Sequence, residues 1–172
     1  SRYHGRIRPD QRRHALDIHS STPSVPEHAE HAALYERIGA SFARQNAMAL
    51  IKARLAAVST GSVEIRMPHW NGVEQQHGFV HGGIVSTIAD SAAGYAAMSV
   101  TPEGASVLSV EFKLNMMAPA QGDELVARGK VVRSGRTLIV TQAEVFAVAQ
   151  GRETLCALMQ QTIMVMHDKA EK

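Results

Sequence analysis

The sequence predicts an α+β fold in which an antiparallel sheet wraps around one long buried helix. Residues 83–100 are apolar on nearly every side when drawn as a helix, which is typical of a buried helix. One β-hairpin precedes this stretch, and four β-rich segments follow it. Because a helix without a polar face must be covered all round, we expect the sheet to curve over it.

The composition fits a single globular domain. A chain of 172 residues can bury roughly 70% of its unfolded surface. Residues 1–20 hold five Arg and two Asp, which leaves thirteen basic and fourteen acidic side chains for the rest. The domain itself is therefore not basic, and no nucleic-acid partner is expected.

Two features bear on the cellular compartment. Cys156 is the single cysteine, so no internal disulfide forms, and a reducing compartment suits the chain. The buried helix is too short, and its side chains are too small, to span a bilayer. We expect a cytoplasmic protein without a membrane partner.

The N-terminal part divides into two segments. Residues 1–30 mix Arg, His, Ser and Pro without apolar periodicity, which predicts a flexible extension. Residues 31–168 then form the single domain. From His31 to about Ala47, apolar residues recur at helical spacing, which predicts an amphipathic N-terminal helix.

A hairpin is expected before the buried helix. Its strands are predicted over about 48–58 and 62–68, joined by a Ser-Thr-Gly-Ser turn. Pro68 and Asn71-Gly72 end the second strand, and a loop over 69–82 leads into the helix.

Four strands are expected after the helix. Their predicted ranges are 105–117, 123–133, 137–149 and 152–166. The first of them alternates polar Ser109, Glu111 and Lys113 with apolar residues on its other face. Residues 133–136, Arg-Ser-Gly-Arg, are predicted to turn between the second and third strands.

Asp90 lies in the middle of the apolar helix. A carboxylate there costs free energy unless it is paired or takes part in chemistry. One interpretation is a hydrogen bond to Ser86, Ser91 or Ser109, or exposure to a wet cavity. The other is a catalytic acid, and the residues alone leave both open.

The glycine-punctuated loop before the helix supplies a family motif. His81-Gly82-Gly83, with an acid nine residues after the histidine, resembles the hotdog-fold acyl-CoA thioesterases. The match continues through 109–123 and 134–146 and covers roughly residues 45–166. It is most similar to the PaaI-like branch (phenylacetate degradation), with 4-hydroxybenzoyl-CoA thioesterases as relatives. The resemblance implies a hotdog fold that hydrolyses acyl-CoA to free acid and coenzyme A, with no metal or redox cofactor.

The resemblance also implies roles for five residues. Asp90 would act as nucleophile or as general base on water, and the Gly82 N–H at the helix start would bind the oxyanion. Gln75, or alternatively the adjacent Gln76, would orient the water or the acyl carbonyl. His81 would structure the loop, and Ser109 would lie beside the nucleophilic water. The plainer alternatives are a tight glycine turn, a loop amide and a polar strand residue.

A basic run in the second half of the chain has two interpretations. Arg128, Lys130, Arg133 and Arg136 lie within nine residues without an acid between them. They form either a solvated hairpin or a site for the phosphates of coenzyme A. The resemblance favours the second for the segment Arg133, Ser134, Gly135, Arg136 and Thr137.

No metal site is expected. His77 and His81 have the spacing of a helical zinc pair, but Gly78 lies between them and no third ligand is evident. Two rival functions remain open. One is a hotdog dehydratase or hydratase, which needs a His and an acid as a proton-transfer pair, and the other is a non-catalytic acyl-CoA sensor or carrier.

Helix geometry predicts the assembly. Gly82 and Asp90 are eight residues apart, or about 12 Å along a helix axis. An oxyanion donor and an attacking group must both lie within roughly 3 Å of the reacting atoms. Two antiparallel helices across a twofold axis satisfy this condition, so we expect a homodimer with shared active sites, paired into a homotetramer as in many members of the family.

Overall fold

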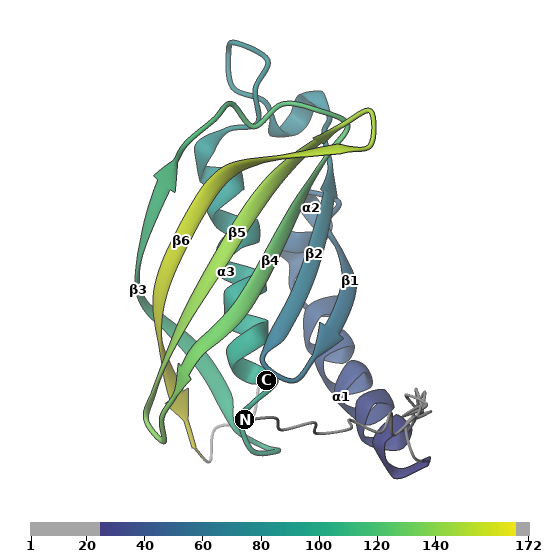
Figure 1. Cartoon of the computed structure of the whole chain (residues 1–172), viewed down its shortest axis with the longest axis vertical. Coiled ribbons are helices and arrows are strands. Elements are labelled where there is room, and N and C mark those ends of the chain that lie inside the picture. The colour runs from purple at the N-terminus through teal and green to yellow at the C-terminus, as the bar shows by residue number, and fades with distance from the viewer. Residues whose placement is uncertain (1–24, 168–172) are drawn as a thin grey trace, which may run out of the picture.

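The computed structural model describes residues 25–167 of the chain, and their side chains from residue 28 onward (Figure 1). Its elements are α1 (Val25–Ala43), α2 (Asn46–Leu50), β1 (Arg54–Ser59), β2 (Ser62–Pro68), the 3-10 helix η1 (Asn71–Val73), α3 (Gly82–Met98), β3 (Ser106–Met116), β4 (Glu124–Ser134), β5 (Leu138–Ala149) and β6 (Arg152–Met166). The part of the prediction that concerns residues 1–24 lies outside the described residues.

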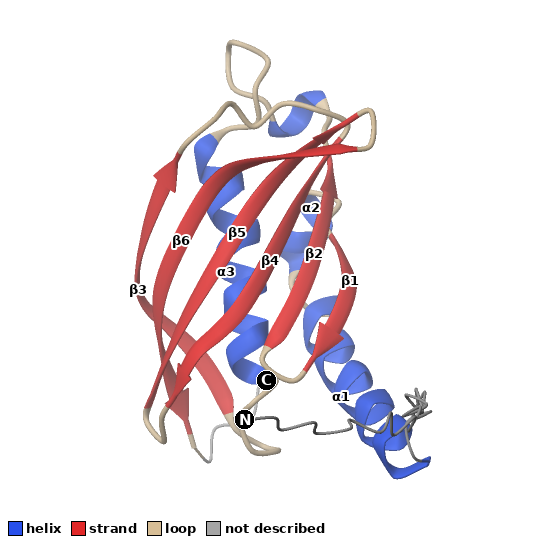
Figure 2. Cartoon of the chain, viewed as in Figure 1, coloured by secondary structure: helices blue, strands red, loops and turns tan. Residues whose placement is uncertain are grey.

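One sheet of six strands, in the order β1-β2-β4-β5-β6-β3, curves around α3 (Figure 2). All of its strand pairs are antiparallel. The helix α1 lies beside β1, at one edge of the sheet. The predicted α+β layout, with a sheet around a central helix and a helix before it, is confirmed.

The helix α3 packs closely against the sheet because most of its buried residues are small. The buried residues of α3 are Val85, Ile88, Ala89, Ala92, Ala93, Tyr95, Ala96, Ala97 and Met98, of which five are alanines. On β4, a Cβ added to Gly129 would lie 2.2 Å from the Ala92 carbonyl oxygen, so strand and helix backbones meet there. The absence of a side chain at Gly129 permits this approach.

The predicted first strand is wrong in its first half. Residues 46–50, expected in part as strand, form the short helix α2, and β1 begins only at Arg54. Met48 and Ile51 are both buried, and their three-residue spacing places them on one helical face. Lys52, with a φ of 59°, then turns the chain into the strand. The helix α1 also begins earlier than expected, at Val25 in place of His31.

The alternation predicted for β3 is interrupted by a bulge. The pairing with β6 shifts by one residue between Ser109 and Glu111. Ser109 pairs with the buried Ile163 and Phe112 with the buried Gln161, so both point to the inner face, whereas Glu111 points outward. Ser109 is thereby aimed at α3, away from the face that carries Glu111 and Lys113.

Candidate active site

Asp90 is hydrogen-bonded to side chains from two strands. Its Oδ1 accepts from Ser109 Oγ at 2.7 Å and from Gln161 Nε2. Gln161 Nε2 also lies 2.7 Å from Ser109 Oγ. Of the three serines considered from the sequence, Ser109 is the partner, since Ser86 bonds the backbone of its own helix and Ser91 faces Gln45.

Gln161 is the member of this group that the sequence reasoning missed. It lies in β6 between the fully buried Met159 and Ile163, and it is itself buried. The available signal was a polar residue at an inward position of an alternating apolar strand. A polar residue in a strand does not by itself indicate its hydrogen-bond partner. Asp90 lies 71 residues earlier in the chain, so only the fold shows that the two side chains meet.

The half-buried Asp90 borders a cleft. The cleft holds about 120 Å³ and is lined by Gln45, Asp90, Ser91, Gly94, Tyr95, Met98, Val107 and Ser109. Its lining is polar around Asp90 and apolar near Met98 and Val107. A small ligand can therefore reach the carboxylate, which supports the catalytic interpretation of Asp90 over a purely structural one.

The start of α3 leaves one backbone donor open. His81 caps the helix, and its Nδ1 accepts from the Gly83 N–H at 2.9 Å. The His81 side chain thus holds the first turn of α3. Among the described residues, no acceptor is bonded to the Gly82 N–H. This donor lies at the positive end of the helix dipole, where an oxyanion is stabilised.

Gln75 lies in the loop before α3. Its Oε1 accepts from the His77 N–H, and its own N–H donates to the Phe79 carbonyl at 2.8 Å. Gly78 closes this turn with a φ of +78°. Within one chain, Gln75 therefore supports its own loop and shares no hydrogen bond with Asp90, so any contact with a ligand would use its Nε2.

The predicted coenzyme A segment forms the exposed turn between β4 and β5. Ser134, Gly135 and Arg136 line a cavity of about 330 Å³. The other lining residues are Val100, Thr101 and Pro102, which come after Ser99, the C-cap of α3, and Ile139, Val165 and His167. His167 Nε2 donates to the Arg136 carbonyl at 2.8 Å. Arg133 and Thr137 are exposed beside this cavity. The segment lies past the end of α3 that is opposite to Gly82.

Arg128, by contrast, is bound to carboxylates. It donates to Glu64 at 2.8 Å and to Glu153 at 2.6 and 2.7 Å, and these bonds raise the pKa of its guanidinium. Burial alone would raise the pKa of Glu64, but the hydrogen bonds from Arg128 and Arg66 outweigh it and hold this pKa below its usual value. Arg128 also lowers the pKa of Glu153. Because its guanidinium is already paired with two carboxylates, Arg128 is a poor phosphate ligand. Of the other three basic residues in the run, Arg133 and Arg136 belong to the segment beside the cavity, whereas Lys130 does not line it.

Cys156 has a structural setting and no place in the candidate site. Cys156 is buried with its Sγ 3.2 Å from the Val145 carbonyl, and burial raises the pKa of its thiol. Within residues 25–167, no group of three His, Cys, Asp or Glu side chains is placed to hold a metal ion. In the same range, no helix combines the length and hydrophobicity that crossing a membrane would require.

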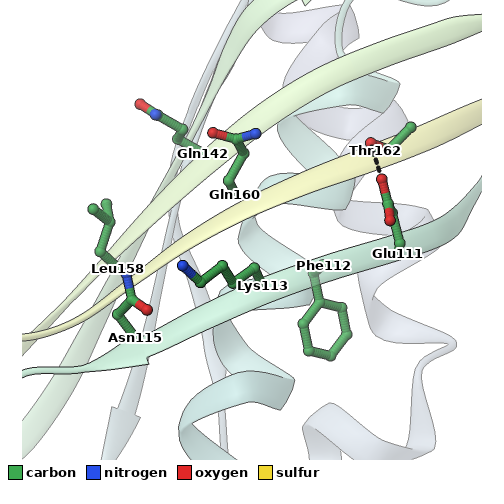
Figure 3. A pocket seen from close by; sticks show the side chains of 8 residues that line it. All are labelled: Glu111, Phe112, Lys113, Asn115, Gln142, Leu158, Gln160 and Thr162. Carbon is green, nitrogen blue, oxygen red and sulfur yellow. Dashed lines mark hydrogen bonds between the residues drawn. The ribbon is translucent and has the colours of Figure 1, made fainter.

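A larger cavity, of about 440 Å³, lies on the outer face of the sheet. Figure 3 shows Glu111, Lys113 and Gln160 on this face, with Glu111 bonded to Thr162, whereas Phe112 leaves β3 on the other side. None of the predicted site residues lines this cavity. Despite its greater volume, it offers no counterpart to the group around Asp90.

Comparisons with known proteins identify the family to which the chain belongs. The family model described as thioesterase superfamily matches residues 77–154. Acyl-coenzyme A thioesterase 13 of Homo sapiens is 31% identical over 123 residues, which cover 65% of this chain and 84% of the human protein. The chain belongs to the thioesterase superfamily, and the resemblance drawn from its sequence is confirmed.

Solved structures show the same fold. A thioesterase family protein from Silicibacter pomeroyi is 46% identical, with a TM-score of 0.77, over 78% of this chain and 98% of that one. The PaaI protein of E. coli, from the phenylacetic acid degradation operon, has a TM-score of 0.69 at 20% identity, over 78% and 94% of the two chains. The hotdog fold is thereby confirmed.

The match to several curated relatives is partial. The chain spans 63%, 66% and 64% of the lengths of three of them, which are named as two putative esterases and an acyl-coenzyme A thioesterase. The names of the relatives agree with the predicted enzyme class, a thioester hydrolase.

Proposed function

We propose that the protein hydrolyses acyl-CoA thioesters to a free acid and coenzyme A. The observation that carries this proposal is the Asp90 carboxylate, which borders a cleft with one oxygen held by Ser109 and Gln161. The other oxygen, Oδ2, accepts no hydrogen bond from the described residues. A carboxylate held in this way is suited to act on a water or on a carbonyl carbon.

Two chemical routes use the same groups. In the first, Asp90 Oδ2 removes a proton from water as the water oxygen bonds to the thioester carbon. The resulting oxyanion accepts from the Gly82 N–H, the C–S bond then breaks, and the thiolate leaves and takes up a proton. In the second, Oδ2 itself attacks the carbon, the C–S bond breaks, and the thiolate leaves and takes up a proton. The resulting anhydride is then hydrolysed by water, which frees the acid and restores the Asp90 carboxylate. Both routes end with the free acid and coenzyme A.

The proposed active unit is a homodimer. Asp90 lies eight residues after Gly82 on α3, about 12 Å along the axis, so the donor and the acid that act on one thioester come from different chains. The strand β3 is an edge of the sheet, and its side chains Leu108, Val110 and Phe112 are 53%, 57% and 48% exposed. Pairing of two β3 strands across a twofold axis would cover them and oppose the two α3 helices.

The predicted phosphate site fits the same scheme. Asp90 and the last residue of α3, Met98, are also eight residues apart, about 12 Å along the axis, and the cavity next to Ser134–Arg136 lies just beyond. An acyl-CoA with its thioester at Asp90 can extend its pantetheine arm along the helix. Its phosphates then reach the guanidinium groups of Arg133 and Arg136.

The test is a panel of acyl-CoA thioesters of varied length and aromaticity, with thiol release measured for the wild type and for Asp90→Asn. The substitution keeps the shape and removes the base, so kcat should fall at least about 100-fold while acyl-CoA still binds. Glu111→Gln is the matched control, because it makes the same acid-to-amide change close to the site. Glu111 lies on β3 two residues after Ser109, but its side chain faces the outer cavity. This control variant should retain wild-type turnover.

Two outcomes would count against this proposal, the first against hydrolysis and the second against the role of Asp90. If the wild type binds acyl-CoA but releases no thiol from any member of the panel, the protein is a sensor or carrier. If Asp90→Asn keeps the wild-type rate, the catalytic acid lies elsewhere.

A further inference from the structure

Gln161 is a polar side chain at a position where β6 otherwise presents apolar side chains to the core. Only 1% of its surface is exposed, and its partner across the strand pair, Thr141 of β5, is completely buried. Gln161 Oε1 and Thr141 Oγ1 have no hydrogen-bond partner among the described residues. Because an unpaired buried polar group destabilises a fold, packing alone does not account for a glutamine here.

The nitrogen of the same amide is engaged twice. Gln161 Nε2 donates to Asp90 Oδ1 and to Ser109 Oγ. The opposite amide orientation would place Oε1 against a carboxylate oxygen, so the network itself fixes the orientation. Since the Ser109 oxygen accepts from Gln161, its own hydrogen is directed to Asp90 Oδ1, which lies 2.7 Å away.

This triangle makes the two oxygens of Asp90 inequivalent. Oδ1 accepts two hydrogen bonds, whereas Oδ2 accepts none from residues 25–167. A carboxylate that rotates about its Cβ–Cγ bond exchanges the two oxygens. Ser109 is exposed, so without the buried amide only a mobile hydroxyl would oppose that rotation.

We infer that Gln161 is a positioning residue, which holds Asp90 so that Oδ2 faces the cleft. The inference rests on the proposed function, in which Oδ2 acts on water or on the thioester. The cleft is lined by Asp90 and Ser109 but not by Gln161, so the amide lies behind the carboxylate and does not touch the substrate. It acts through Asp90 and through the direction that it imposes on the Ser109 hydroxyl.

The test compares two buried substitutions on neighbouring strands. Gln161→Met keeps the length of the side chain and removes the donor, whereas Thr141→Val removes a polar atom at similar depth that has no bond to Asp90. We expect Gln161→Met to lower kcat on the order of 10- to 100-fold, as for outer partners that orient metal ligands, with KM changed less than about twofold. Thr141→Val should leave both constants unchanged.

A second readout does not depend on turnover. In dimers labelled with ¹³C at aspartate carboxyls, the Asp90 signal is assigned by its loss in Asp90→Asn. This signal should move in Gln161→Met and stay in place in Thr141→Val. Gln161→Asn, which withdraws the amide by one methylene, is a second variant in case the first does not fold, and it should also lose kcat and move the signal.

Three results would overturn the inference. They are an unchanged kcat in a folded Gln161 variant, an equal loss in Thr141→Val, and an Asp90 signal that does not move. A wild type that releases no thiol would instead contradict the proposed hydrolase, and the carboxyl signal would then decide the contact on its own.

Discussion

At the scale of residues, Arg133 and Arg136 offer a test of how coenzyme A is bound. Replacing both with Ala removes charge-assisted hydrogen bonds to phosphate, so KM for acyl-CoA should rise about tenfold or more with little change in kcat. The effect should vanish on acyl-pantetheine, which lacks the nucleotide. Arg152→Ala, at the turn between β5 and β6 at the opposite end of the sheet, is the matched control. Equal losses on both substrates would remove the pair from this role.

The sequence predicts most residues of the candidate site and one of its contacts. Asp90 is a charge within an apolar helix, and Ser109 is one of three serines considered as its hydrogen-bond partner, as well as a residue that the family resemblance picks out. Gln161 was hidden because one amide in a strand is unremarkable until the fold brings it to Asp90. The bond from the His77 N–H to Gln75 was equally hidden, since it depends on the geometry of one loop.

At the scale of elements, the contact between β4 and α3 depends on Gly129. A methyl group there would overlap the Ala92 carbonyl, and neither backbone can move far. Gly129→Ala should therefore lower the free energy of unfolding by about 1–3 kcal/mol, the range for overpacked cores, as measured by urea denaturation. Gly39→Ala in α1, where an added Cβ meets nothing within 4 Å, should be neutral or stabilising. Similar losses in both variants would contradict this account.

The elements themselves were predicted unevenly. The helix α3 and the last three strands follow from strong periodicity, and their ends are close to those expected. Residues 46–58 carry a mixed pattern that suits both helix and strand, and burial of Met48 and Ile51 decides for a helical turn. No glycine marks the bulge after Ser109 in the sequence. The bulge changes which side chains of β3 point inward and which point outward, and this change is visible only from the pairing of β3 with β6.

At the scale of the whole molecule, the shared site predicts that two inactive variants restore each other. Asp90→Ala removes the acid. Gly82→Pro removes the donor at the first residue of α3, where proline is tolerated, and His81 already has a ψ of 136° that suits a following proline. Random exchange of the two chains should recover about a quarter of wild-type activity, because half of the dimers carry one intact site.

The readout is thiol release before and after subunit exchange, with heterodimers verified by two affinity tags. Each variant mixed with itself is the control and should stay inactive. Inactive heterodimers that are folded, or a monomer with full activity, would disprove the shared site.

The order of strands in the sheet also constrains how the chain folds during synthesis. The strand β3 is made before β4 and β5, yet within residues 25–167 it pairs with β6 alone, which is the last strand of that range. Until β6 has left the ribosome, β3 lacks the one hydrogen-bonding neighbour that it has among the described residues, and the cover over α3 is incomplete. Native pairing must therefore await distant contacts, which slows folding and leaves apolar surface open to aggregation or to chaperones. A nascent chain stalled before Arg152 should accordingly remain sensitive to protease along α3 and β3.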